Sequence, residues 1–572
     1  MTGTVTRVNG PLVETDGLTG VAMHDVVELG PHRLPGEVVA VRGTGATVQA
    51  YEYTGGLAPG DPAFGSGEPL SVRLGPGLLG GIFDGLLRPL SDAPTWLVPA
   101  AVGTTPGATR WPFRPQVATG AEVAEGDALG VVEDGGPVPY LVQVPPGVAG
   151  QVSYVAVEGE YGADDRAATV SGVDVQLSTR WPVRRPRPFR ARLDSVEGLH
   201  TGQRVIDLLF PLTRGGTAGV PGGFGTGKTL LLQQIAKWCD ADVIVYVGCG
   251  ERGNEMADVV RELAELVDPR TGDSLARRTV VIANTSNMPM MAREASIYTG
   301  VTVGEYFRDM GRHCVVIADS TTRWAEALRE MSSRTNELPA EEGYPANLAS
   351  ALAAFYERAG RVTTLSGEVG SVTVVGAVSP AGGDMTEPVT AHTQRFVRCQ
   401  WSLDRDLAYA RHYPAVSWSA SFGRDVEQFA AWHARTGDPS WTERRHQVTG
   451  LLAEAERLAS LAELVGVGAM PGRERVVMLA GRLLREAVLQ QSALSVNDAN
   501  CSAAKGGALV DAVLAVVNRC RELVDAGVPA AAIEEIDFVG LIHVRDAVGP
   551  DDVAGVEAQR DLMLTRLEGV AP

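Results

Sequence analysis

The stretch that most constrains the fold is residues 219–238, which read GVPGGFGTGKTLLLQQIAKW. From Gly222 onward they match GxxxxGK[ST], the pattern of a phosphate-binding loop. Its glycines let backbone N–H groups surround a polyphosphate without interference from side chains. A helix expected from Leu230 to Lys237 adds the positive end of its dipole. The residues before the loop include no long apolar run, so the strand leading into it must be short.

The loop and the start of the helix are the predicted nucleotide site. Lys228 would reach the β- and γ-phosphates, and the Thr229 hydroxyl would bind Mg²⁺. Only three of the chain's 50 basic residues are lysines, which favours a need for a compact charge at position 228. The alternative, a glycine-rich turn before an amphipathic helix, is less favoured. The residues expected to bind nucleotide here are Gly222, Gly223, Phe224, Gly225, Thr226, Gly227, Lys228, Thr229 and Leu230.

Two other apolar segments end in charged residues. The first runs into GCGERGNE, placing Glu251 and Arg252 just past the carboxyl end of a strand, where α/β sheets bind ligands. A carboxylate there can orient the water that attacks a γ-phosphate, but a surface Glu–Arg pair capping a helix fits the pattern equally well. The second, CVVIAD, ends at Asp319 in a Walker B form, which would hold Mg²⁺ through water. A helix-capping aspartate is the alternative for Asp319.

The chain is expected to be a multi-domain α/β protein. Residues 1–70 carry short strands separated by turns, which predicts a small antiparallel barrel. Residues 71–110 would be a connection packing on the nucleotide domain, and 111–188 an inserted β-rich module with hairpins at 117–132 and 147–157. Residues 189–424 alternate strands and helices, which predicts a parallel nucleotide-binding sheet, and 425–572 are helical. The predicted strands of that sheet are Asp242–Val247, Thr279–Ala283, Cys314–Ala318 and Ser371–Val378, and its predicted helices are Asn254–Leu266, Met288–Gly300 and Thr321–Arg334.

Composition narrows the function classes. A net charge of −19 argues against nucleic acid as the main partner. The basic patch at 184–192 contains prolines, which favour a linker at a domain boundary. The six cysteines lack metal-ligand spacing, which is typical of reduced thiols in a cytosolic protein. The sequence has no signal peptide and no apolar run of about 18 residues, so we expect no membrane span.

Several segments in order resemble the catalytic A subunit of V-type and archaeal-type rotary ATPases. They are GPLV at 10–13, GEPLSVRLGPGLLGGIFDGLLRPL at 67–90, GFGTGKT at 223–229, GCGERGNEMADV at 248–259, the run from NTSNMP to WAEALRE at 284–330, SPAGGDMTEPVT at 379–390 and LQQ at 489–491. The resemblance covers nearly the whole chain. It implies an N-terminal β-barrel, an inserted bulge module, a RecA-like P-loop core and a C-terminal helical domain.

The same resemblance implies roles for individual residues. Glu251 matches the family's catalytic carboxylate and Arg252 its neighbour on the phosphate side. Lys228, Thr229 and Asp319 match the P-loop and Walker B positions. At the adenine end the family implies Gln490 and Gln491, with Phe422 as a weaker candidate for ring stacking.

The implied activity is hydrolysis or synthesis of Mg-ATP, coupled to H⁺ or Na⁺ transport. The implied partners are a non-catalytic B subunit in an alternating three-plus-three ring, central and peripheral stalks, and a membrane sector that moves the ion. The complex would lie on the cytoplasmic face of the membrane. A hexameric RNA translocase is a second possibility, but residues 1–70 hold few of the basic and aromatic residues it needs. A non-catalytic nucleotide-binding subunit is a third, against which the intact Lys228, Thr229 and Glu251 argue.

Overall fold

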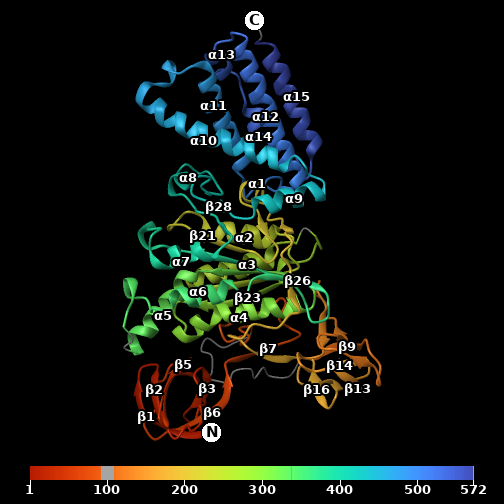
Figure 1. The fold of residues 1–572 in the computed structure, drawn as a ribbon, viewed down its shortest axis with the longest axis vertical. Coiled ribbons are helices and arrows are strands. Elements are labelled where there is room, and N and C mark those ends of the chain that lie inside the picture. Colours follow the sequence, from red (N-terminus) through yellow and green to blue (C-terminus); the bar gives the residue numbers. More distant parts are fainter. Residues whose placement is uncertain (92–108, 135, 269, 336–337, 571–572) are drawn as a thin grey trace.

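The computed structural model describes residues 1–91, 109–134, 136–268, 270–335 and 338–570. Figure 1 shows an elongated molecule. The N-terminal barrel and the inserted β module lie at one end, the large mixed sheet with its helices lies in the middle, and the C-terminal helices lie at the other end. The predicted multi-domain α/β class is therefore confirmed.

The N-terminal strands close into a barrel in the order β1-β2-β5-β4-β3-β6. Its strands alternate inward and outward residues, as β3 does along its five positions. The inward side chains, among them Val13, Val27 and Val48, form a separate small core. The barrel strands are β1 (Thr2–Asn9), β2 (Leu12–Asp16), β3 (Asp25–Leu29), β4 (Leu34–Arg42), β5 (Gly45–Ala50) and β6 (Pro62–Pro69).

The inserted module consists of two small sheets, and here the hairpin prediction is wrong. Within 117–132, β10 pairs with β13 whereas β11 pairs with β9 and β12, so the turn between them carries the chain from one sheet to the other. Within 147–157, β13 pairs with β10 and β15. Turn spacing marks strand ends but not strand partners, which caused the error. The strands are β9 (Trp111–Pro115), β10 (Glu122–Val123), β11 (Ala128–Val132), β12 (Tyr140–Gln143), β13 (Gly150–Val155), β14 (Gly159–Tyr161), β15 (Arg166–Val170) and β16 (Val173–Gln176).

The stretch after the barrel contributes to two other regions. Its strand β7 (Ser71–Leu74) pairs with β17 (Thr179–Pro182), which follows the inserted module. Its strand β8 (Ile82–Phe83) joins the edge of the central sheet beside β23. Residues 92–108 of the predicted connection lie outside the described residues, so the predicted domain boundaries remain expectations.

The central sheet has the order β28-β27-β21-β26-β24-β22-β23-β8, and β21, β26, β24, β22 and β23 run parallel. The strands read as continuous apolar runs because helices cover both faces. All four predicted strands are present. The sheet comprises β18 (Ala191–Arg192), β21 (Thr217–Pro221), β22 (Val243–Glu251), β23 (Thr279–Thr285), β24 (His313–Asp319), β25 (Gly360–Thr363), β26 (Val369–Val378), β27 (Cys399–Gln400) and β28 (Phe422–Gly423) with β8, and β19 (Gly198–Leu199) pairs separately with β20 (Leu212–Thr213).

One helix of this domain is longer than predicted, and several others were not predicted at all. Helix α4 runs nine residues beyond its predicted end, because its second half is buried on all sides and carries no amphipathic pattern to read. Four helices, α1, α6, α7 and α8, were not predicted. The helices are α1 (Arg204–Leu209), α2 (Lys228–Trp238), α3 (Gly253–Glu265), α4 (Met290–Asp309), α5 (Thr321–Thr335), α6 (Leu348–Tyr356), α7 (Pro388–Phe396) and α8 (Arg405–Tyr409).

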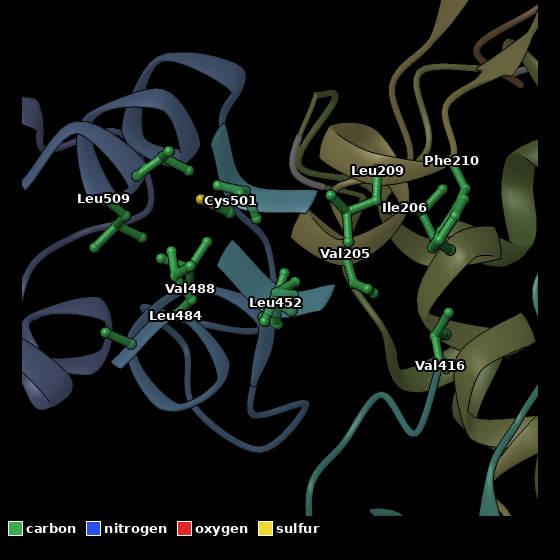
Figure 2. Packing of buried hydrophobic residues seen from close by; sticks show 14 of the residues in the cluster. Val205, Ile206, Leu209, Phe210, Val416, Leu452, Leu484, Val488, Cys501 and Leu509 are labelled. Carbon is green, nitrogen blue, oxygen red and sulfur yellow. The ribbon is translucent and has the colours of Figure 1, made fainter. Parts of the chain in front are cut away.

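The C-terminal part is helical, as predicted. One apolar core joins it to the central domain: Figure 2 shows Val205 and Leu209 of α1 facing a group that includes Leu452 of α10 and Val488, which follows α11. The short helix α1 is therefore the anchor between the two domains. The helices are α9 (Val426–Thr436), α10 (Trp441–Val465), α11 (Gly472–Leu483), the π-helical continuation Leu484–Leu489, α12 (Ala503–Asp525), α13 (Ala530–Glu534), α14 (Val539–Ala547) and α15 (Val553–Glu568).

Two other sequence expectations concern cysteines and membranes. All six cysteines are buried free thiols. Within the part of the chain that the structure describes, no helix combines the length and apolarity that a membrane crossing requires.

Candidate active site

The phosphate-binding loop connects β21 to α2 at the carboxyl edge of the central sheet. Strand β21 is short and fully buried, as the sequence predicts, and α2 begins at Lys228, two residues earlier than expected. The Gly222 N–H bonds to the Val378 carbonyl at 3.1 Å, which ties the start of the loop to β26. The loop is thus held by the two central strands beneath it.

Three of the four loop glycines, at 222, 225 and 227, have an identifiable reason to be glycine. A Cβ atom at Gly222 would lie 2.7 Å from Thr226 Oγ1 and 2.8 Å from Leu403 Cβ, so no side chain fits there. Gly225 and Gly227 adopt φ angles of 79° and 85°, which favour glycine. Phe224, at the tip of the loop, is 92% exposed. The loop is therefore arched by its glycines, with its one large apolar side chain turned outward.

Lys228 lies under the loop. Its Nζ donates hydrogen bonds to the carbonyls of Gly222 at 2.5 Å and Gly223 at 3.1 Å. Burial lowers the pKa of Lys228, and the carboxylates of Asp319 and Glu251 act in the opposite direction. A third N–H remains for a ligand, because an ammonium has three donors.

Thr229 and Asp319 come together beside Lys228. Thr229 Oγ1 lies 3.3 Å from Asp319 Oδ2, and the hydroxyl of Tyr246 donates to the same oxygen at 3.1 Å. Burial raises the pKa of Asp319, against the effects of Tyr246 and Lys228. Sequence reasoning did not single out Tyr246, which lies inside β22 and reads as an ordinary core residue.

The Thr229–Asp319 pair has the donor chemistry that a hard dication needs. Both side chains offer oxygen, and Asp319 is a buried carboxyl group that a nearby cation would keep ionised. Among the described residues no cluster of three or more His, Cys, Asp or Glu side chains could hold a metal alone. That fits Mg²⁺, which binds through one or two protein oxygens and completes its shell with water and phosphate.

Glu251 is the last residue of β22, where it is half-buried at the same edge of the sheet. Burial, the nearby Asp319 carboxylate and a hydrogen bond with Glu255 raise the pKa of Glu251 to about 8. With its pKa raised in this way, Glu251 holds a proton near neutral pH unless a cation approaches. Glu255 is a site residue that the sequence analysis missed, although its place four residues on, in the first turn of α3, could have indicated it.

Arg252 occupies the N-cap position of α3 and is exposed. Among the residues that the structure describes, its side chain makes no hydrogen bond or ion pair. It is therefore available to a ligand or to a neighbouring subunit.

The three residues expected at the adenine end, Gln490, Gln491 and Phe422, have different partners in the structure. The Gln491 side chain is buried and bonded to Gly202 O at 2.7 Å and Arg204 N at 2.9 Å. The Gln490 side chain reaches Arg411 O at 3.3 Å. Phe422 pairs with Gln400 in the sheet, stacked under the Arg424 guanidinium.

The aromatic ring nearest the loop is that of Tyr413. A Cβ atom at Gly227 would lie 3.1 Å from it, and a small hollow there is lined by Tyr413, Leu230 and Gln491 but not by Phe422. Leu230 is 41% exposed beside this hollow. A lone tyrosine in a loop carries no sequence signal, so Tyr413 could not have been found without the structure.

Four family descriptions match successive parts of the chain. They are the beta-barrel domain of the ATP synthase alpha/beta family (5–64), the ATP synthase alpha/beta subunit barrel-sandwich domain (105–184), the nucleotide-binding domain of the ATP synthase alpha/beta family (202–423) and the C-terminal domain of V and A type ATP synthase (430–529). The fold and the loop geometry therefore define a P-loop nucleotide-binding protein of this superfamily.

Full-length relatives narrow the family further. The chain is 49% identical to a V-type ATP synthase alpha chain of Anaeromyxobacter sp. (strain K), with 99% of this chain and 100% of the relative covered. It is 47% identical to the A subunit of the A-type ATP synthase of Methanopyrus kandleri, with 97% and 96% covered. The chain belongs to the family of catalytic alpha (A) subunits of V-type and A-type ATP synthases.

A solved structure supports the fold alone. The assembled ATPase EscN of the type III secretion system of enteropathogenic E. coli matches with a TM-score of 0.64 at 21% identity, over 90% of this chain and 100% of that one.

Proposed function

We propose that the chain hydrolyses or synthesises ATP at the edge of the central sheet, as the catalytic subunit of a rotary complex. The observation that carries the proposal is the convergence of Lys228, Asp319 and Glu251, which come from three different strand ends. Their charges influence one another across the site. A structural P-loop without activity would not need a half-buried carboxyl group facing the lysine.

The residues would divide the work as follows. The loop N–H groups and Lys228 hold the terminal phosphates, and the remaining N–H of Lys228 points to the charge that develops there. Glu251 would orient the attacking water once cationic groups have lowered its pKa. Arg252 supports the phosphate from the side of α3.

Mg²⁺ would be held by Thr229 and, through water, by Asp319, and it would neutralise charge on the phosphates. The adenine end would lie in the hollow beside Leu230, bounded by Tyr413 and Gln491, and Gln490 is the neighbouring residue in the chain. Because the Gln491 side chain is fully engaged with Arg204 and Gly202, its contribution would be to shape this wall. Phe422 would contribute only indirectly.

The proposed assembly is an alternating three-plus-three ring with a non-catalytic B subunit, joined through central and peripheral stalks to a membrane sector on the cytoplasmic face. Family membership supports a place in such a complex; the ring order, the faces and the ion, H⁺ or Na⁺, are proposed. An arginine from the B subunit would complete the site, and such arginines raise turnover by about 10³- to 10⁵-fold in related enzymes.

Reconstitution tests this function. ATPase activity is measured for the purified chain alone, for a B-type partner alone and for their mixture, with and without Mg²⁺. We expect turnover in the mixture that requires Mg²⁺, and almost none in either protein alone. Equal turnover by the isolated chain would contradict the arginine in trans, and no turnover by an assembled ring would contradict the catalytic role.

A further inference from the structure

A cavity of about 300 Å³ lies between the inserted β module and α4, and the proposed function does not use it. Strands β12, β16 and β17 form one side of it, and Tyr306 and Asp309 of α4 form the other. Leu365 closes one end. The cavity is therefore built from three segments that are distant in the sequence.

One wall of the cavity is a buried arginine with unused donors. Arg187 is only 7% exposed. Its Nε donates to Asp309 Oδ2 at 2.6 Å, and its backbone N–H donates to Glu305 at 2.9 Å. Within the described ranges neither terminal nitrogen donates a hydrogen bond, and Nη1 is completely enclosed. Leaving charged donors unpaired away from water is costly.

The two carboxylates nearest Arg187 are also shared with other arginines. Glu305 accepts two hydrogen bonds from Arg358, at 2.5 and 3.0 Å. Asp309 gives its second oxygen to Arg308 at 2.6 Å. Asp174, which also lines the cavity, is paired with Thr169 at 2.6 Å and lies 3.6 Å from Arg166. Of these carboxylates, only Asp309 pairs with the Arg187 side chain, through Nε.

Arg184, three residues earlier, is an arginine of the same segment whose two terminal nitrogens both have hydrogen-bond partners. Its terminal nitrogens bond to both oxygens of Glu294, at 2.9 and 2.6 Å, and one also reaches Glu37 at 3.3 Å. The Arg187 side chain is more deeply buried than that of Arg184 but lacks such a fork-shaped partner. A carboxylate supplied from outside could pair with Nη2, because Nη1 is enclosed and Nε already donates to Asp309, and a charge-assisted hydrogen bond of this kind is strong.

The other residues that line the cavity indicate the chemistry of the uncharged part of the ligand. The Arg187 guanidinium lies 4.7 Å from the ring centre of Trp181 and 5.7 Å from that of Tyr306. Leu141, Val175 and Leu177 add apolar surface. We propose that this cavity binds a small organic carboxylate, whose charged group pairs with Nη2 of Arg187 and whose flat apolar body packs between the module and α4.

Binding of 4-fluorobenzoate to the full-length chain tests the site, followed by ¹⁹F NMR and calorimetry without nucleotide. We expect saturable binding at millimolar concentrations. Arg187→Gln should weaken probe binding by about tenfold to a hundredfold, because it removes a charge-assisted hydrogen bond to the carboxylate. The neutral probe 4-fluorobenzyl alcohol should bind wild type as weakly as the acid binds this variant. Arg185→Gln is the matched control, because Arg185 also stacks on Trp181 yet is exposed and does not line the cavity.

A second variant separates loss of binding from loss of folding. Leu365→Trp fills part of the cavity and keeps every charge, so it should abolish probe binding while the circular dichroism spectrum stays that of wild type. Absence of saturable binding to wild type would overturn the proposal. So would equal affinity in wild type, Arg187→Gln and Leu365→Trp.

Discussion

Two lysines, the half-buried Lys228 and the fully buried Lys505, have opposite roles. Burial lowers the pKa of both. Lys505 is completely buried in α12, and its Nζ donates to the carbonyls of Asn497, Arg545 and Val548, at 2.9, 2.8 and 3.1 Å. Lys228 has two carbonyl acceptors, both in its own loop. All three N–H donors of the Lys505 ammonium are therefore used, whereas the Lys228 ammonium has one donor left.

The difference lies in what surrounds each charge. The three acceptors of Lys505 come from two separate segments, so it joins the start of α12 to the end of α14. Lys228 instead has an open donor and lies close to Asp319 and Glu251, whose charges act on it. A buried charge with all its partners inside the chain is structural, whereas one with a missing partner points to a ligand. The same reasoning distinguishes Arg184 from Arg187.

The largest effect should come from Glu251→Gln. The amide keeps the shape and most contacts but cannot act as a base, so turnover of the reconstituted ring should fall by about 10²- to 10⁴-fold. Nucleotide affinity, measured with a fluorescent ATP analogue, should stay close to wild type. Asp258→Asn on the exposed face of α3 is the control. Full turnover in Glu251→Gln would remove the assigned role.

Lys505→Met should come next, acting on stability alone. It leaves three carbonyl groups without their donor, so we expect a loss of about 2–3 kcal/mol in the free energy of unfolding. Guanidinium titration followed by circular dichroism measures it. Nucleotide affinity should be unchanged at a temperature where the variant is folded. A stable variant with impaired nucleotide binding would contradict the distinction between the two lysines.

Lys228→Ala should show the reverse pattern. Nucleotide affinity should fall by about tenfold to a hundredfold, because a charge-assisted contact to phosphate is lost. Its unfolding midpoint should move less than that of Lys505→Met, since its acceptors belong to a glycine-rich loop near solvent. Unchanged ATP affinity would show that Lys228 does not contact phosphate.

Local patterns predicted the elements that form the candidate catalytic edge. Strands such as β22 and β24 are buried on both faces, so their apolar runs were visible, and the charged residues that end them followed directly. The glycines at 222, 225 and 227 are required by close packing or by positive φ angles, which is why the loop could be recognised. Lys228, Asp319 and Glu251 were expected at one edge, and the structure brings them together.

Partners distant in the sequence could not be predicted. The patch at 184–192 looked like a linker, but Arg184 bonds to Glu294 and Arg187 to Asp309, more than a hundred residues away. Gln491 bonds to Arg204 through a chain separation of 287 residues. The pairing of β10 with β13 in the inserted module could not be predicted for the same reason, because the partner strand is distant in the sequence. The sequence shows which residues are charged, but it does not show which distant strand or helix will contact them.

The smallest effect is a difference in pH dependence between wild type and Glu251→Gln. The pKa of Glu251 is raised from 4.5 to about 8, so the folded chain holds this proton more tightly than the unfolded chain does. Its contribution to stability is therefore full below about pH 4.5 and is lost as the pH rises through about 8. At Asp498 the sign is opposite: against the effect of burial, Arg204 and Arg545 lower its pKa, so its contribution is lost only as the pH falls below about 3.8.

Denaturant titrations of the nucleotide-free, divalent-free chain from about pH 5 to about pH 9 separate the two regions. Wild type should lose stability relative to Glu251→Gln as the pH rises across this range, because only wild type must give up the proton that the folded chain holds on Glu251. The contacts around Asp498 and Lys505 should contribute no difference, since Asp498 stays ionised throughout. Parallel curves for the two proteins would mean that folding does not raise the pKa of Glu251, and the contrast between the phosphate-binding edge and the contacts around Lys505 would then depend on Lys228 alone.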